Sequence, residues 1–288
     1  MAVSRPVKVI ECSRDAMQGL HDFIPTATKI AYVQQLLAVG FDTLDVGSFV
    51  SPKAIPQMAD TSAVLDGLDL SQTRTKLLAI VANRRGAEAA VATPQVDYLG
   101  YPFSVSETFQ LRNTNATIAE SLERLHEIQQ LTEQHDKQLV VYLSMGFGNP
   151  YGDPWSVAVV SHWTEALAER GIRILQLSDT IGVSTPDSID YLFSKLIPAY
   201  PEVEFGAHLH TTPSTWREKV DAAYQSGCRR FDGALKGYGG CPMAKDELTG
   251  NMPTEHIIDY LSETDTLSLD RQQLNRALNM LPSVFPYS

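Results

Sequence analysis

The chain has 288 residues, of which 43% are hydrophobic, and its formal net charge at pH 7 is −11. A chain of this length buries either one large barrel core or the cores of two smaller domains. The acidic balance and the lack of a Lys/Arg run argue against a nucleic-acid or anionic-membrane surface and favour a small molecule as partner.

The three cysteines, Cys12, Cys228 and Cys241, are odd in number and widely spaced. This spacing suggests neither a disulfide framework nor a zinc ribbon, so a reducing compartment fits best. The first predicted strand starts near Val7, which leaves no room for a signal or transit peptide, and no apolar run approaches membrane-spanning length. We therefore expect a cytoplasmic protein.

Eight apolar, β-branched runs alternate along the chain with segments of helical periodicity. The predicted strands cover residues 7–12, 43–49, 76–82, 96–101, 139–145, 174–180, 204–210 and 229–235. Predicted helices include residues 27–39, 118–134, 155–171 and 215–227, and several are closed by a glycine. Eight βα repeats over about 250 residues predict a (β/α)8 TIM barrel, whereas a doubly wound sheet would have fewer strands and a glycine-rich first turn.

We expect one catalytic domain over residues 1–288, with the barrel at about 7–262 and a C-terminal helical extension at 263–288. Residues 254–261 and 270–280 carry the last two helical patterns. Residues 101–115 form the longest polar connection, and we expect a loop there as a candidate lid or substrate wall.

A pair of histidines lies near the end of the seventh predicted strand. His208 and His210 are two positions apart, so their side chains point the same way. Asp15 and Asn251 offer oxygen ligands from neighbouring strand ends, because barrel closure makes the first, seventh and eighth strands adjacent. This donor set favours Mg²⁺ or Mn²⁺ over structural zinc, and the alternative is a hydrogen-bonded histidine pair in the barrel mouth.

Other polar residues also fall at the carboxyl ends of predicted strands, where TIM barrels carry their active sites. Arg14 either forms an ordinary ion pair with Asp15 or stabilises an enolate or carboxylate oxygen beside a metal. Asp45 and Asp179 either hold loops through backbone hydrogen bonds or act as acid–base groups near a dication. The candidate substrate-binding residues are Ser48, Tyr142, Ser144 and Lys236.

Cys241 follows three glycines, Gly237, Gly239 and Gly240. These glycines permit either a tight turn with a buried thiol or a mobile loop whose thiol donates or accepts a proton over a closed site. Lys236 is compatible with a Schiff base in a metal-free aldolase, although a solvated or anion-pairing lysine is commoner.

Together these segments resemble 3-hydroxy-3-methylglutaryl-CoA (HMG-CoA) lyase, a member of the TIM-barrel metallolyase superfamily that also contains isopropylmalate synthase. The resemblance runs through nearly the whole chain. SFVSPK, IPQM and GGCP are typical of the lyases rather than the synthases. The segments that carry it are SRDAMQ (13–18), SFVSPKAIPQMAD (48–60), SETFQLRN (106–113), LSDTIGVSTP (177–186), AHLH (207–210) and GGCPMAKDELTGNMPTE (239–255).

The resemblance implies a divalent cation, an acyl-CoA thioester substrate and, by analogy, a homodimer. Arg14 would steady an enolate, and Cys241 would act as acid or base from a mobile loop. Asp179 would fill an acidic role behind the ligands, and Glu255 would support the last loop. The implied metal ligands are Asp15, His208, His210 and Asn251.

The chain departs from the lyases at three informative positions. Asp45 stands where the lyases carry a glutamate, and its side chain is one methylene shorter. Thr211 follows the histidine pair in place of the usual aspartate, and Val140 replaces a basic residue. We expect metal-dependent cleavage of an HMG-CoA-like thioester into acetoacetate and acetyl-CoA. The alternatives are another 3-hydroxyacyl-CoA or a 4-hydroxy-2-oxoacid as substrate, a Schiff-base aldolase, and a catalytically silent binding barrel.

Overall fold

The computed structural model describes residues 6–240 and 249–286 of the chain. Within these ranges, eight parallel strands form a closed sheet, because β1 pairs with β2 on one side and with β8 on the other. The predicted TIM barrel is therefore confirmed. The strands are β1 (Lys8–Glu11), β2 (Thr43–Ser48), β3 (Lys76–Ile80), β4 (Tyr98–Ser104), β5 (Gln138–Ser144), β6 (Ile174–Asp179), β7 (Glu204–Thr211) and β8 (Arg230–Gly233).

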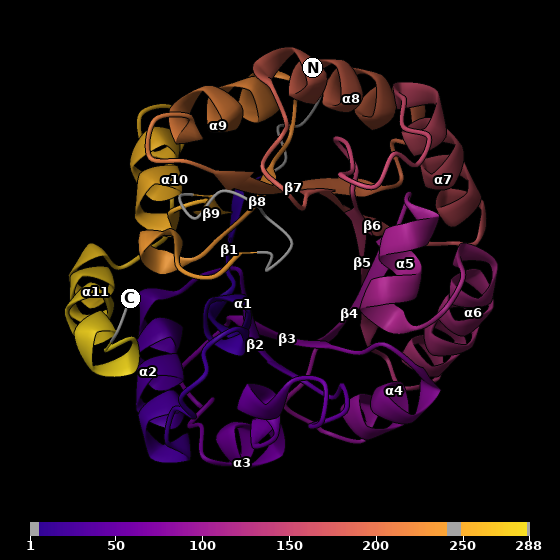
Figure 1. Ribbon diagram of the computed structural model, residues 1–288. Helices are drawn as coiled ribbons and strands as arrows, with labels where there is room; N and C mark the ends of the chain where they lie inside the picture. Colours follow the sequence, from indigo (N-terminus) through magenta and orange to yellow (C-terminus); the bar gives the residue numbers. More distant parts are fainter. Residues whose placement is uncertain (1–5, 241–248, 287–288) are drawn as a thin grey trace.

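Helices surround the sheet as an outer ring, with α1 and α5 inside that ring at one end of the barrel (Figure 1). Two 3-10 turns, η1 (Pro56–Met58) and η2 (Leu235–Gly237), lie in the connections. The helices are α1 (Ser13–Gln18), α2 (Thr26–Val39), α3 (Thr61–Asp66), α4 (Arg84–Val91), α5 (Glu107–Thr114), α6 (Ile118–Gln134), α7 (Val157–Glu169), α8 (Pro186–Ala199), α9 (Trp216–Gln225), α10 (Thr254–Leu261) and α11 (Arg271–Val284).

Local capping signals explain why the predicted helices begin and end close to where they were expected. The predicted helix 118–134 coincides with α6, which starts at a capping box formed by Thr117 and Glu120. The predicted helix 27–39 corresponds to α2, which ends at Gly40 with φ of 83°. Only glycine adopts this left-handed conformation without a steric cost.

The prediction of a loop over residues 101–115 is wrong. Strand β4 continues to Ser104, and α5 occupies most of the remaining segment. The hydroxyl of Ser106 caps α5 by accepting a hydrogen bond from the backbone N–H of Phe109. The polar composition of this segment concealed a short helix, since a helix of eight residues shows little periodicity.

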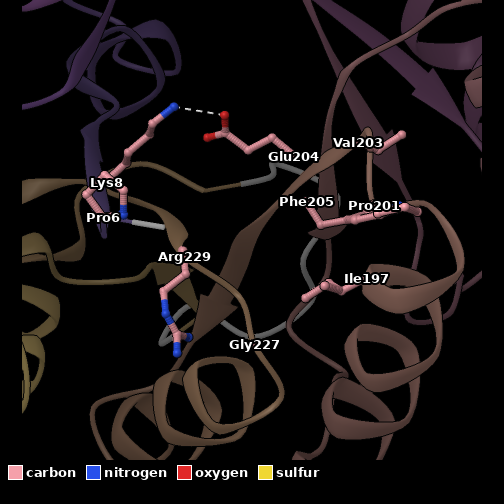
Figure 2. A pocket seen from close by; sticks show the side chains of 9 residues that line it. All are labelled: Pro6, Lys8, Ile197, Pro201, Val203, Glu204, Phe205, Gly227 and Arg229. Carbon is pink, nitrogen blue, oxygen red and sulfur yellow. Dashed lines mark hydrogen bonds and ion pairs between the residues drawn. The ribbon is translucent and has the colours of Figure 1, made fainter. Parts of the chain in front are cut away.

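The barrel interior contains an apolar cluster and carries charged residues at its amino-terminal end. A separate apolar cluster fills the interior, and Arg230 lies fully buried where β8 begins. At this end Nζ of Lys8 and a carboxylate oxygen of Glu204 form an ion pair of 2.8 Å beside a cavity of about 430 Å³ (Figure 2). The interior cluster consists of Leu78, Ile80, Val140, Tyr142 and Ile174.

The C-terminal helix α11 packs on the outside of the barrel against α2 (Figure 1). The ring of Tyr32 on α2 meets that of Phe285 edge to face at 6.1 Å, and the Gln35 side chain bonds to Gln273 on α11. The predicted C-terminal extension is therefore a helix attached to the first large helix of the barrel.

A short ninth strand links the last connection of the barrel to β7. Strand β9 (Gly250–Asn251) runs antiparallel to β7 and pairs Asn251 with His210. This pairing brings a segment that follows β8 back to the carboxyl end of β7. Among the described residues, no helix has the length and apolar character needed to cross a membrane.

Candidate active site

Four side chains named as metal ligands meet at the carboxyl end of the barrel. Asp15 lies in α1, directly after β1, and His208 and His210 project from β7. The ligand atoms of these three residues all lie within 4.8 Å of one another. Nδ2 of Asn251 donates to Oδ2 of Asp15 at 2.7 Å and to the carbonyl of Tyr238 at 2.9 Å. One carboxylate, two imidazoles and a carboxamide therefore share one small region.

Arg14 lies in the same region and is surrounded by acceptors. Its Nε and Nη2 donate to Asp45, and its Nη1 donates to Oδ1 of Asp15 at 3.0 Å and to Gln18 at 2.8 Å. Burial alone would lower the pKa of Arg14, but the charges of Asp45 and Asp15 outweigh it and raise that pKa. Arg14 therefore stays a cation at any working pH.

The two carboxylates that bind Arg14 differ in their protonation behaviour. Burial raises the pKa of Asp45 to about 6, even though Arg14 pulls in the opposite direction. Burial would also raise the pKa of Asp15, but the charges of Arg14 and His208 outweigh it, so that pKa is lowered. The ligand candidate is thus the carboxylate that remains ionised, as a metal ligand must.

The two histidines lie in different environments. Burial opposes protonation of His208, but the hydrogen bond and charge of Asp232 outweigh it and raise the pKa of His208. Burial and the charge of His208 both lower the pKa of His210. Nδ1 of His210 is buried and has no hydrogen-bond partner among the described residues. A buried imidazole nitrogen without a partner calls for an explanation, and a cation bound by this ring is one.

Asp232 is a buried residue that the sequence reasoning did not single out. It lies on β8, and its Oδ2 is 3.1 Å from Nδ1 of His208. Asp232 could have been found in the sequence as an aspartate inside the apolar run 229–235. A charge buried in such a run needs a partner within the barrel.

A cavity of about 480 Å³ opens beside these groups. Tyr142 and Ser144, both named as substrate-binding residues, line it, and the hydroxyl of Tyr142 is buried without a hydrogen-bond partner among the described residues. The guanidinium of Arg112 on α5 also lines the cavity and lies 4.7 Å from the ring centre of Tyr151. The segment expected as a lid or wall therefore contributes a wall, in helical form. The apolar lining includes Val50, Ile55, Ile80, Pro102 and Phe109.

Among the described residues, the predicted site residues that are not part of the lining of this cavity are Asp45, Ser48, Asp179, Lys236 and Asn251. The Ser48 hydroxyl accepts a hydrogen bond from the N–H of Val50 and stabilises a turn. Asp179 accepts from the backbone of Val183 and Ser184 and from Nζ of Lys219, at 3.0 Å for the lysine. These contacts match the loop-holding alternative for Asp179.

Lys236 and Cys241 complete the predicted set. The Lys236 side chain is 56% exposed, and its Nζ lies 3.8 Å from Oε1 of Glu255. Glu255 also accepts a hydrogen bond from the backbone of Lys236, so it supports the connection after β8. Cys241 lies outside the described residues, next in sequence to Gly240, which lines the cavity.

The glycine-rich connection before Cys241 passes close to the candidate ligands. A Cβ atom on Gly239 would lie 2.6 Å from the carbonyl oxygen of Asp15, and Gly239 has φ of 83°. A glycine is required here by both the left-handed backbone and the close approach to α1. This segment therefore packs directly against Asp15, whose carboxylate is a candidate metal ligand.

The fold and the site define a TIM-barrel enzyme with a buried arginine and candidate metal-ligating side chains at the carboxyl ends of its strands. The chain belongs to the HMGL-like family, whose model matches residues 8–281.

Relatives and solved structures agree with this assignment. The chain is 33% identical to the 3-hydroxy-3-isohexenylglutaryl-CoA/hydroxy-methylglutaryl-CoA lyase of Pseudomonas aeruginosa, over 91% of this chain and 87% of the relative. It is 31% identical to the mitochondrial hydroxymethylglutaryl-CoA lyase of Arabidopsis thaliana, over 89% of this chain but 54% of that longer protein. An HMG-CoA lyase from Acinetobacter baumannii, solved with coenzyme A and 3-methylmalate, superposes with a TM-score of 0.90 at 32% identity, covering 100% of this chain and 94% of that one.

Proposed function

We propose that this protein is a divalent-metal-dependent carbon–carbon lyase that cleaves HMG-CoA into acetoacetate and acetyl-CoA. The observation that carries the proposal is the placement of Arg14 against Asp15, within the group formed by Asp15, His208 and His210, at the edge of one cavity. The family and the lyase relatives support the same reaction class.

The residues present fit a hard divalent cation. Asp15 has a lowered pKa, and Nδ1 of His210 is buried without a partner among the described residues. We propose Mg²⁺ or Mn²⁺ as the cation, because the donor set mixes carboxylate and amide oxygen with imidazole nitrogen. Coordination by the oxygen of Asn251 requires its carboxamide to rotate, since its nitrogen faces Asp15. The proposed ligands are Asp15, His208, His210 and Asn251.

The reaction breaks the bond between C2 and C3 of the substrate. When bound, the cation supplies Lewis acidity that eases loss of the proton from the tertiary C3 hydroxyl. As that hydroxyl becomes the ketone of acetoacetate, the electron pair of the broken bond passes to the acetyl-CoA enolate, which takes up a proton at carbon. Arg14 is fixed beside the cavity as a permanent cation and would stabilise the enolate oxygen. Cys241, outside the described residues, is the proposed proton donor.

Asp45 acts in this proposal through Arg14. Asp45 is fully buried and is not part of the cavity lining. Its carboxylate accepts hydrogen bonds from Nε and Nη2 of the Arg14 guanidinium. We therefore propose that Asp45 positions Arg14 rather than contacting the substrate. Its shorter side chain, compared with the glutamate of the lyases, still reaches the guanidinium.

A coupled assay that measures the release of acetyl-CoA from HMG-CoA tests the proposal. The assay is run first with Mg²⁺ or Mn²⁺ and then with a chelator added. We expect release that depends on the cation and stops when the chelator is added. No release from folded, metal-loaded protein would reject HMG-CoA as the substrate.

A related 3-hydroxyacyl-CoA with a larger apolar group at C3 is the second candidate substrate. The observation that favours it is the apolar wall of the cavity, which includes Ile55, Ile80 and Phe109. The Pseudomonas relative carries a 3-isohexenyl substrate in its name. Rates over a panel of 3-substituted 3-hydroxyglutaryl-CoA thioesters and 4-hydroxy-2-oxoacids would separate these candidates. The exposed, ion-paired Lys236 gives no support to a Schiff-base aldolase.

We also propose a cytoplasmic location and a homodimer. Two free, buried thiols, Cys12 and Cys228, are consistent with a reducing compartment. The homodimer rests on the resemblance to the lyases alone, and light scattering of the purified protein tests it.

A further inference from the structure

We infer that Gln176 and Asp232 are positioning residues that fix the imidazole of His208 for cation binding. The inference rests on the proposed metal site, because the ring that they hold is one of its ligands. The three residues lie on adjacent strands, β6, β7 and β8; Gln176 and Asp232 are buried, and the His208 side chain is 13% exposed at the barrel mouth.

The contacts form an unbroken chain from Gln176 to the imidazole. Nε2 of Gln176 donates to Oδ1 of Asp232 at 2.6 Å, and Oδ2 of Asp232 lies 3.1 Å from Nδ1 of His208. Asp232 and His208 are paired neighbours in the register of β7 and β8. Both oxygens of this buried carboxylate are therefore used, one by the amide and one by the ring.

Gln176 reaches Asp232 across the intervening strand, and a glycine makes this possible. In the register of β6 and β7, Gln176 is paired with Gly206. A Cβ atom at position 206 would lie only 1.6 Å from Oε1 of Gln176. The glycine backbone here is not in the left-handed region, so the position is constrained by space and not by conformation.

The arrangement has a cost that a purely apolar barrel core would avoid. Oε1 of Gln176 is buried and has no hydrogen-bond partner among the described residues. Leaving an amide oxygen unpaired disfavours the folded state. Because the unpaired oxygen of Gln176 is unfavourable, the favourable interaction of this side chain is the hydrogen bond that its amide nitrogen donates to Asp232.

The chemical consequence concerns which nitrogen of His208 is free. A carboxylate only accepts hydrogen bonds, so Nδ1 of His208 carries the hydrogen and Nε2 keeps its lone pair. A carboxylate behind a ligating imidazole fixes both the ring orientation and this tautomer. Gln176 restrains the carboxylate in turn, because its amide occupies the oxygen that the imidazole does not use.

The first experiment compares Gln176→Ala with the matched control Gln129→Ala. Gln129 lies on α6 outside the barrel, its Oε1 is also buried without a partner among the described residues, and it also lies close to a glycine, Gly171. Electron paramagnetic resonance measures the concentration of free Mn²⁺ during a titration. The titration gives the Mn²⁺ dissociation constant of each protein. We expect Gln176→Ala to raise the Mn²⁺ dissociation constant about tenfold, and Gln129→Ala to leave it unchanged.

A second readout does not use the metal. In metal-free protein, the ¹⁵N chemical shifts of His208 report which ring nitrogen carries the hydrogen. We expect the Nδ1–H form in the wild type and a mixture of the two tautomers in Asp232→Ala, a change that simple loss of stability would not produce. If Asp232→Ala fails to fold, Gln176→Ala and its Mn²⁺ dissociation constant still decide the matter.

The close approach of Gly206 supplies a coupling test. Gly206→Ala alone should displace Gln176 and weaken Mn²⁺ binding, whereas adding it to Gln176→Ala should have little further effect. Unchanged Mn²⁺ binding and tautomer in Gln176→Ala would overturn the inference and leave the proposed function standing. The expected Mn²⁺ results without turnover of any thioester would overturn the proposed function and keep the inference. A wild type that binds neither Mn²⁺ nor Mg²⁺ would overturn both.

Discussion

Arg14 and Asp45 form a buried ion pair in which Nε and Nη2 of the guanidinium donate to Oδ2 of the carboxylate at 3.0 and 2.5 Å. Arg14 is 7% exposed and Asp45 is fully buried. Because α1 carries Arg14 and β2 carries Asp45, this pair fixes the first helix to the second strand. The direction in which Arg14 faces the cavity is therefore set by a residue that does not line the cavity.

Asp45→Asn should destabilise the fold, because it leaves the Arg14 charge buried without its main partner. Breaking a buried pair on one side costs about 3–5 kcal/mol of unfolding free energy. Denaturant unfolding measures this loss. The control is Glu88→Gln in the exposed Arg84–Glu88 pair, which should have a far smaller effect because solvent screens this pair. Equal effects of the two substitutions would contradict the importance of the buried pair.

Arg14→Lys should reduce kcat while leaving Mn²⁺ bound. A lysine keeps the positive charge but has a single ammonium nitrogen. It therefore cannot bind Asp45 and Asp15 through separate nitrogens and face the cavity as well, as the guanidinium does. Loss of one well-placed donor to a developing oxyanion costs about 10²–10³ in kcat. Steady-state kinetics and Mn²⁺ titration of the same preparation check this. A normal kcat would exclude Arg14 from enolate stabilisation.

His208→Ala and Asp15→Asn should each weaken Mn²⁺ binding by about 100-fold or more, since loss of a ligand exceeds the effect of losing its supporting residue. His126→Ala serves as control, because that histidine is exposed on α6. Equilibrium dialysis with metal analysis gives the affinities. Full turnover by metal-stripped His208→Ala would show that the reaction proceeds without this site.

Glu11 should make the protein less stable as the pH rises. Burial raises the pKa of Glu11 from its usual value of 4.5 to about 8, despite hydrogen bonds from Thr254 and Leu235. Below pH 4.5 both the folded and the unfolded chain hold the proton. Between pH 4.5 and about 8 only the folded chain holds it, so unfolding free energy is lost as the pH rises, by at most about 1.4 kcal/mol per pH unit.

Glu11→Gln removes this titration and should flatten the dependence of unfolding free energy on pH over that window. Denaturant unfolding of both proteins at pH 5, 6, 7 and 8 gives the difference between the two curves. A difference that does not vary with pH would show that Glu11 titrates alike in both states.

The sequence alone determined the barrel and the strand ends that carry the candidate active site. Hydrophobic periodicity and helix capping are local properties, so the strand runs and helices such as α6 were readable from neighbouring residues. The alternation of side chains along a strand likewise placed His208 and His210 on one face. The helix at 107–114 was taken for a loop, because it is short and polar.

The tertiary structure decided which polar side chains meet. Asp232 and Gln176 are separated by 56 residues, and their contact depends on the register of three strands and on the space left by Gly206. Likewise, Asp179 binds Lys219 and its own loop, while Tyr142 faces the cavity, although both lie at strand ends. Strand periodicity fixes which side of the sheet a residue faces, whereas its partners follow from pairing between distant segments.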